Sequence, residues 1–150
     1  KSFGKGTVQQ AIPLGDGSTV KLTLYKWLSP KGHWIHETGV EPTIEQRQPD
    51  FYYTHPIQIE EPLAFDQASN MIRNAQIMLQ GLGYKDVRVD GYFDRETEAA
   101  VKDFQQKHGL NVTGEIDEKT AAELEVQIIE KIRNGEEDAQ LEKALEALYQ

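Results

Sequence analysis

The second half of this 150-residue chain contains the stretch Gly91-Tyr92-Phe93-Asp94-Arg95-Glu96-Thr97. A matching stretch follows it as Gly114-Glu115-Ile116-Asp117-Glu118-Lys119-Thr120. In each copy a glycine permits a turn, an apolar residue enters a core, and an aspartate caps the next helix with a threonine three positions on. The repeat therefore predicts two helices, each of which starts directly after an aspartate.

Apolar residues recur at helical spacing on both sides of this repeat. We expect a first helix that begins after an N-cap at Asp66 and ends at about Gln80, before Gly81 and Gly83. The second helix should end near residues 108–109 and the third at residues 134–135, since a glycine commonly follows a helix. Residues 66–133 thus form a three-helix module, with these inward positions: Met71, Ile72, Ala75, Met78, Leu79, Leu82, Ala100, Val101, Phe104, Ala121, Leu124, Ile128 and Ile132.

The first half has the pattern of β structure. Residues 7–12 predict a strand, residues 13–18 a turn, and residues 20–27 alternate apolar and polar side chains, as a half-buried strand does. A short third strand is expected at residues 34–35. The resulting β-meander should direct its apolar side chains into a core that other parts of a protein supply, because an isolated hairpin is marginal in water; these side chains are Val20, Leu22 and Leu24. The fold class is therefore α+β.

Lys5 is the first candidate site residue, since it stands between Gly4 and Gly6 just before the first strand. Flanking glycines allow a close backbone approach that could aim a lysine into a tight cavity. A lysine in a dry cavity loses its charge more readily than one in water, and the neutral amine can accept a proton from a nucleophile. Gln9 would lie on the same strand face and could orient the amine by a hydrogen bond. The alternative is an exposed lysine in an ordinary Gly-Lys-Gly turn.

Charge and composition exclude several kinds of partner. The net charge is −9 and the acidic excess falls on the second half, which argues against binding to nucleic acid or to an anionic membrane surface. No apolar run is long enough to span a membrane. The chain has no cysteine, which excludes disulfides and thiolate metal sites. His33 and His36 lie on opposite faces of a strand and are interpreted as surface or hydrogen-bonded histidines.

Residues 48–65 separate the two halves. Pro49, Pro56 and Pro62 keep this segment extended, which is typical of a linker. The aromatic residues 51–53 indicate that the linker lies against a surface.

The first 45 residues or so resemble the carboxyl-terminal processing proteases, which are serine peptidases of peptidase family S41 with a Ser-Lys catalytic dyad. The resemblance rests on residues 1–10 (Lys-Ser-Phe-Gly-Lys-Gly-Thr-Val-Gln-Gln) and continues through residues 17–23, 29–32 and 39–42 in the family's order. It implies that Lys5 is the general base, that Gln9 supports it, and that no metal and no cofactor take part. The family's nucleophilic serine lies upstream of the lysine, so we expect this chain to be a fragment that is inactive alone.

Residues 74–124 resemble the peptidoglycan-binding domain 1 family. The matching segments are residues 80–84, 89–93, 97–105 and 109–114. The resemblance implies a compact three-helix fold that commonly attaches bacterial cell-wall enzymes to peptidoglycan. Most of the matching residues are turn glycines, caps and core, which specify the fold and leave the function open. Tyr84 and Tyr92 could offer rings to a sugar or could equally belong to the core.

A last acidic helix is expected within residues 134–150, with a narrow apolar stripe formed by Leu141, Ala144, Leu145 and Leu148. A helix of this length does not hold together alone in water, so the stripe should dock on its own module, on the protease body or on a second copy of the chain. Leu141, Leu145 and Leu148 are accordingly the candidate residues for self-association in a homodimer.

The expected organisation follows from both resemblances. Residues 1–47 form the C-terminal part of a serine protease core, residues 48–65 a linker, residues 66–133 the helical module and residues 134–150 the last helix. The expected function is that of the C-terminal portion of a bacterial endopeptidase that cleaves proteins or peptides in the cell envelope, after export. The alternative is a non-catalytic module for peptidoglycan binding or dimerisation.

Overall fold

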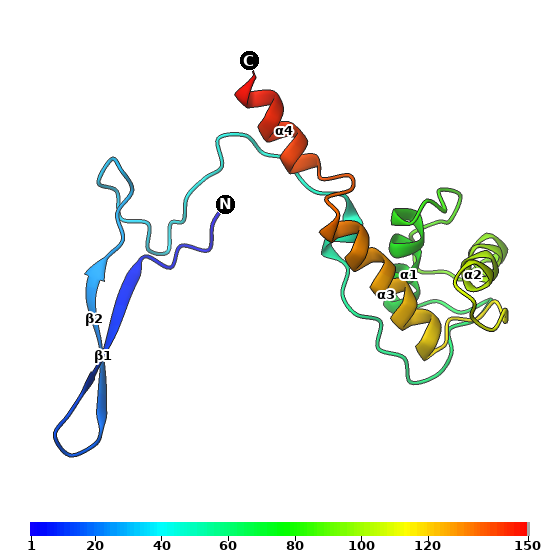
Figure 1. The fold of residues 1–150 in the computed structure, drawn as a ribbon, viewed down its shortest axis with the longest axis horizontal. Coiled ribbons are helices and arrows are strands. Elements are labelled where there is room, and N and C mark those ends of the chain that lie inside the picture. The colour runs from blue at the N-terminus through cyan, green and yellow to red at the C-terminus, as the bar shows by residue number, and fades with distance from the viewer. Residues whose placement is uncertain (150) are drawn as a thin grey trace. The chain divides into compact units, whose positions relative to one another are not determined.

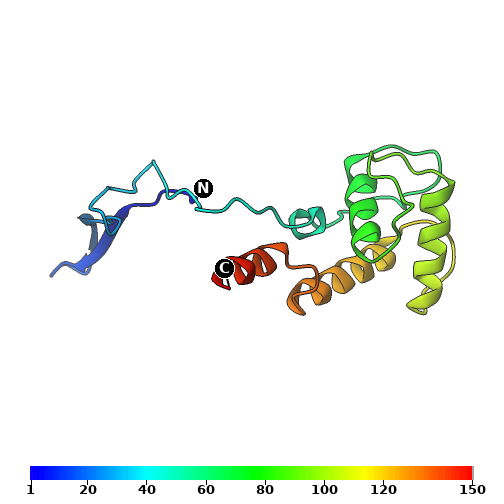
Figure 2. The same ribbon diagram turned by 90° about the horizontal axis from the view of Figure 1, so that it is seen from above.

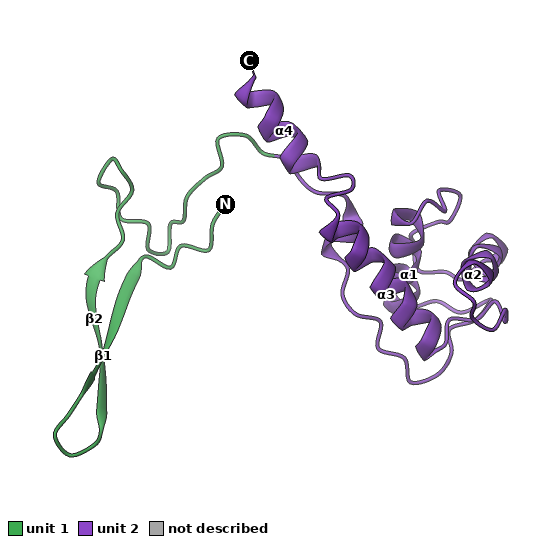
Figure 3. Ribbon diagram, viewed as in Figure 1, with its two compact units in different colours: residues 1–45 green, residues 46–150 purple. Residues whose placement is uncertain are grey.

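A computed structural model describes residues 1–149, and the chain divides into two compact units, Lys1–Glu45 and Gln46–Gln150 (Figure 3). The first unit contains only β structure, whereas the second contains all of the helices. This composition confirms the α+β prediction. Of the helices in residues 1–149, none has both the length and the apolar character that a membrane span requires.

The first unit is an antiparallel hairpin of β1 (Thr7–Pro13) and β2 (Thr19–Lys26), shown in blue in Figure 1. The register places Thr7 opposite Lys26 and Pro13 opposite Thr19, with a bulge opposite the step from Val8 to Gln9. The third strand expected at residues 34–35 is reduced to one isolated bridge between Leu28 and Trp34.

The apolar face of β2 is open within this unit. Val20, Leu22 and Leu24 are 37%, 43% and 44% exposed, so residues 1–45 supply no core of their own to cover them. The alternation that predicted the strand was read correctly, but residues 1–45 do not provide the burial that it implies.

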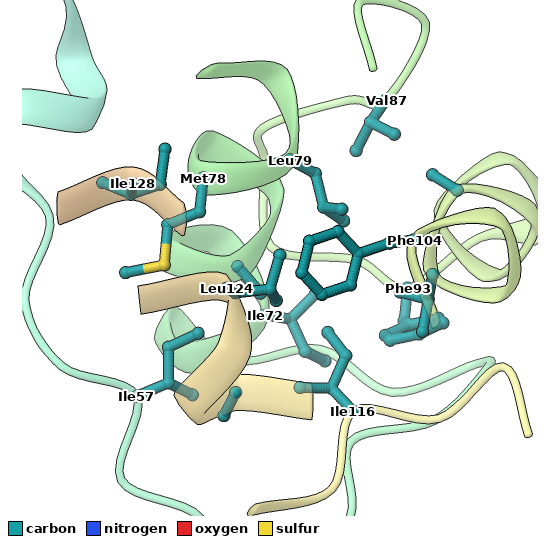
Figure 4. Packing of buried hydrophobic residues seen from close by; sticks show 14 of the residues in the cluster. Ile57, Ile72, Met78, Leu79, Val87, Phe93, Phe104, Ile116, Leu124 and Ile128 are labelled. Carbon is teal, nitrogen blue, oxygen red and sulfur yellow. The ribbon is translucent and has the colours of Figure 1, made fainter. Parts of the chain in front are cut away.

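The second unit is built from four α-helices and one short 3-10 helix. These are η1 (Asp50–Tyr53), α1 (Asn70–Gly81), α2 (Arg95–Lys107), α3 (Glu118–Arg133) and α4 (Ala139–Leu148). α3 and α2 both pack on α1, and Figure 2 shows α1 and α2 side by side. Phe93, Phe104, Ile72, Leu79, Ile116 and Leu124 are fully buried at the centre of the core (Figure 4).

Both aspartates of the sequence repeat cap a helix, as predicted. The Asp94 carboxylate accepts hydrogen bonds from the Thr97 backbone N–H at 2.9 Å and from its hydroxyl at 2.7 Å. Asp117 does the same for Thr120, at 2.8 Å and 2.6 Å. Each cap thus satisfies a backbone donor of the first turn, which has no partner inside the helix.

The predicted start of the first helix was wrong. α1 begins at Asn70 and its N-cap is Ser69, whose hydroxyl accepts a hydrogen bond from the Ile72 N–H. Asp66 has a φ of 70° and instead accepts a hydrogen bond from the Tyr92 hydroxyl at 2.8 Å. The physical reason is tertiary: Leu63 forms a bridge with Ile116 and Ala68 forms a bridge with Tyr92, and the chain turns at residues 65–66 between these bridges, so the helix begins only after Ser69.

The segment expected to be a linker belongs to the helical core. Phe51 and Ile57 are only 4% and 7% exposed and lie in the same apolar cluster as α1 and α3. Gly81 makes room for Phe51, because a Cβ at this glycine would lie 2.9 Å from the ring. The aromatic residues that suggested a surface contact therefore make a buried one.

Within residues 1–149, the long-range hydrogen bonds that tie α4 to this unit lie at its N-terminal end. Asp138 caps the helix and accepts a hydrogen bond from the Gln48 side chain at 2.7 Å, and the Tyr52 hydroxyl donates to the Glu136 carbonyl. Farther along, Leu141, Leu145 and Leu148 are 52%, 43% and 78% exposed. The predicted helix also included Gln150, which lies outside the described residues.

Candidate active site

Lys5 lies in the segment just before β1, between two buried glycines. A Cβ at Gly6 would overlap the backbone nitrogen of His36 and lie 2.7 Å from its Cα. A Cβ at Gly4 would lie 2.9 Å from the backbone nitrogen of Gly39. The close approach expected from the flanking glycines is therefore present, and the segment it meets is the loop of residues 34–40.

Hydrogen bonds from this loop hold the carbonyls on both sides of Lys5. The Glu37 N–H donates to the Gly4 carbonyl at 2.9 Å. The Gly6 carbonyl accepts two hydrogen bonds, from the Trp27 backbone N–H at 2.8 Å and from the Trp34 indole Nε1–H at 2.9 Å. A further pair joins Ser2 to Val40. The backbone around Lys5 is thus tied down, whereas its side chain is exposed within this unit.

Gln9 is exposed on β1, and its side-chain amide donates to the Thr23 hydroxyl at 3.3 Å across the hairpin. Within residues 1–149 no hydrogen bond joins Gln9 to Lys5. The structure therefore places both predicted residues at the same end of one hairpin without connecting them.

His33 and His36 lie apart in their surroundings. His33 is exposed, and the ring of His36 packs on Trp34 with centroids 5.0 Å apart. Among the described positions, no three metal-ligating side chains gather closely enough to hold an ion.

The helical unit contains two buried glutamines that the sequence analysis missed. The Gln76 amide donates to the Tyr92 carbonyl at 2.8 Å and accepts from the Gly91 N–H at 2.9 Å. Gln105 does the same for the second copy of the repeat, with the Glu115 carbonyl and the Gly114 N–H. The sequence signal for these glutamines was a polar residue on the inward face of each helix. Gln76 lies 15 positions before Gly91, whereas Gln105 lies 9 positions before Gly114, so the sequence does not show that the two glutamines have the same role.

Tyr84 and Tyr92, the candidates for stacking on a sugar, are both half-buried. Burial, together with a hydrogen bond to Asp103, raises the pKa of Tyr84. A hydrogen bond to Asp66, together with burial, raises the pKa of Tyr92. Both hydroxyls are therefore engaged within the module, while both residues remain partly exposed.

Comparison with known proteins assigns a family to each part of the chain. Residues 1–46 match the family model of peptidase family S41. Residues 68–124 match the family model described as "Putative peptidoglycan binding domain". The lysine segment and the helical module thus fall in different families.

Curated relatives match the chain along nearly all of its length. The carboxy-terminal processing proteases CtpB and CtpA of Bacillus subtilis (strain 168) are 50% and 39% identical to it, over 99% and 98% of the chain. The chain spans 31% of the length of each. Among solved structures, the SleB N-terminal domain matches 47% of this chain and 96% of that one at 27% identity, with a TM-score of 0.45, which is too low to support an argument.

The order of these matches is the order of the two structural units, with the lysine segment in the first and the three-helix module in the second. The chain is therefore similar along nearly all of its length to the carboxy-terminal processing proteases, with a segment that matches peptidase family S41 followed by one that matches a putative peptidoglycan binding domain.

Proposed function

We propose that this chain supplies the general-base lysine of a Ser-Lys endopeptidase, together with a module that binds the cell wall. In this proposal residues 1–47 complete the protease core, and the nucleophilic serine is contributed from outside the chain. The exposed apolar face of β2 fits such a role, since a further sheet of the protease core would bury the side chains of Val20, Leu22 and Leu24.

The proposed chemistry is acyl transfer to a serine. The serine oxygen attacks the scissile carbonyl while the neutral Lys5 amine takes the hydroxyl proton. The C–N bond then breaks, and Lys5 returns the proton to the leaving amine. Water releases the acyl group by the same steps in the second half of the reaction, with Gln9 orienting the amine.

The observation that carries the proposal is the matched lysine segment at residues 1–46, in which Lys5 is bracketed by two glycines with no room for side chains. An ordinary exposed turn requires no such approach. Gly15, Gly17 and Gly32 illustrate the contrast, because a Cβ at any of them would meet nothing within 4 Å.

The test compares cleavage of an unfolded protein by the full-length enzyme and by its Lys5→Ala variant. We expect Lys5→Ala to abolish cleavage, whereas Lys31→Ala, an exposed lysine in a turn of the same unit, should leave the rate unchanged. Equal activity of Lys5→Ala and the unaltered enzyme would refute the base assignment. We further propose protein or peptide substrates and a location in the bacterial cell envelope after export, in keeping with the peptidoglycan-binding domain.

Peptidoglycan binding by residues 68–124 is the second candidate function, and it rests on the matched family. The test is co-sedimentation of this chain with purified peptidoglycan, with a double variant Tyr84→Ala/Tyr92→Ala beside it. Loss of sedimentation in the variant supports recognition by the two half-buried rings. A chain that stays in solution would refute wall binding and favour an assembly role.

We also propose that the α4 stripe joins two copies of the chain. Leu141, Leu145 and Leu148 are exposed on one short helix, and its hydrogen bond to the Gln48 side chain lies at its N-terminal end. Sedimentation of Leu141→Glu/Leu145→Glu beside the unaltered chain tests this. An unchanged mass would refute the homodimer.

A further inference from the structure

We propose that Trp34 is a positioning residue for Lys5, an inference that rests on the proposed function of Lys5 as the general base. The indole N–H of Trp34 holds the Gly6 carbonyl, and through it the backbone on the C-terminal side of the lysine. The loop of residues 34–40 thus sets where the lysine side chain leaves the backbone.

The Gly6 carbonyl fixes the backbone next to Lys5 because hydrogen bonds occupy both of its acceptor positions. The Trp27 backbone N–H occupies one at 2.8 Å and continues the ladder of the hairpin. The Trp34 indole occupies the other at 2.9 Å. A carbonyl oxygen accepts about two hydrogen bonds, so this one is fully satisfied, and the peptide plane that carries it has a fixed orientation.

The Trp34 ring is itself held in place. Its backbone forms the isolated bridge with Leu28. One contact of the ring is with His36, with centroids 5.0 Å apart and planes tilted by 32°, and another is with the Lys26 ammonium, 4.5 Å from the ring centroid. An indole with these neighbours presents its N–H to Gly6 in one direction, which is what a positioning group requires.

The same loop holds the other side of Lys5, where the Glu37 N–H donates to the Gly4 carbonyl. Gly6 also packs directly on the His36 backbone, so no side chain fits between the loop and the lysine segment. Lysine has a flexible four-carbon stem, and its amine returns to one place only if its Cα is fixed. The loop supplies that constraint from both sides.

Replacing Trp34 by Phe separates positioning from folding. The ring remains to pack on His36 and Lys26, and the Gly6 carbonyl keeps its backbone hydrogen bond from Trp27. Only the indole donor is lost. The peptide between Gly6 and Thr7 is then held by one hydrogen bond and can rotate, and Lys5 moves with it.

The experiment measures kcat and KM of the full-length enzyme on a fluorescently labelled unfolded casein. We expect Trp34→Phe to lower kcat by about 10- to 100-fold, the loss typical of a displacement of about 1 Å at a catalytic group. KM should stay within about twofold, because the lysine acts in the chemical step and not in substrate binding. Trp27→Phe is the matched control, since its side chain is 62% exposed and the backbone hydrogen bond to Gly6 does not depend on it.

Introducing Trp34→Phe into the Lys5→Ala variant shows whether the effect of Trp34 on kcat depends on the lysine side chain. Trp34→Phe should add no further loss to Lys5→Ala, since a residue that only positions Lys5 has nothing to act on when the amine is absent. All variants are assayed below their measured melting temperatures, so that unfolding does not contribute to the rates.

The outcomes distinguish this inference from the proposed function. An unchanged kcat in Trp34→Phe, with Lys5→Ala inactive, overturns the positioning role and leaves the base assignment in place. An active Lys5→Ala enzyme overturns both. An equal loss in Trp27→Phe, or a further loss in the double variant, indicates general damage to the hairpin and also overturns the role of Trp34.

Discussion

Replacing Gln105 by alanine should destabilise the helical unit far more than the same change at its neighbour Gln106. Gln105 is 1% exposed and makes five hydrogen bonds, three to the second copy of the repeat and two to Thr113 just before it. Gln106 lies next to it on α2 and is exposed. Both changes gain the same small amount from the higher helix propensity of alanine, so the difference between them isolates the buried network.

The size of the loss follows from which groups keep a partner. The Thr113 N–H retains the Asn111 carbonyl, and the Thr120 hydroxyl retains Asp117. The Gly114 N–H loses the one hydrogen bond it makes within residues 1–149, and the Glu115 carbonyl keeps only a long contact of 3.4 Å to the Thr113 hydroxyl. Two stranded backbone groups at about 1 to 1.5 kcal/mol each give a loss of about 2 to 3 kcal/mol.

Urea unfolding followed by far-ultraviolet circular dichroism measures this loss. Both tryptophans lie in Lys1–Glu45, so tryptophan fluorescence reports on the hairpin while the helical signal reports on the second unit. With a slope of about 1.5 kcal/mol per M, Gln105→Ala should lower the unfolding midpoint by about 1.5 M. A midpoint no lower than that of Gln106→Ala would refute the reasoning, because the turn would then be held without the glutamine.

Two further predictions concern the caps and the turns of the same unit. The Thr120 hydroxyl and N–H lower the pKa of Asp117, so its stabilising effect is present above about pH 4, the ordinary range of an aspartate, and is lost as pH falls through the lower folded value. The urea midpoint should therefore fall on acidification, and Asp117→Asn should show a weaker pH dependence; an equal dependence in both would contradict the cap. Gly91→Ala should cost about 1 to 3 kcal/mol more than Gly83→Ala, because both glycines have positive φ but only at Gly91 would a Cβ meet an atom, the Ser69 carbonyl oxygen at 2.7 Å. Thermal melting of the two variants checks this, and equal melting temperatures would show that the turn yields without cost.

The helical unit was largely predictable because its signals are local. Asp94 and Asp117 cap helices, and α2 and α3 end next to Gly109 and Gly135, as their sequence neighbours indicated. A cap depends on residues three positions apart, so the chain carries the whole pattern within one turn of helix. The start of α1 was not predictable in this way, since the chain before it is held by the bridges of Leu63 to Ile116 and of Ala68 to Tyr92, which join segments far apart in the sequence.

The candidate site was likewise predictable where its signals are local and not where they depend on distant segments. Lys5 could be identified from its glycines and from the resemblance of residues 1–46, and the close approach expected there is present. The partner in that approach could not be identified, because the loop of residues 34–40 meets Gly6 across 28 positions of sequence. Trp34 was interpreted as part of a strand, and nothing local distinguishes that role from an indole aimed at a distant carbonyl.

The sequence by itself determined the resemblance to two families, the order of the halves, and the caps and turns of the helices. It also identified Lys5 as the candidate base, since each of these features is encoded in a short motif. Only the tertiary structure decided that Phe51 and Ile57 enter the helical core, that buried glutamines hold both turns, and that Trp34 and Glu37 fasten the backbone around Lys5. The physical reason is that hydrogen bonds and packing between distant segments depend on where the whole chain brings them, and that placement is a property of the folded unit and not of any single motif.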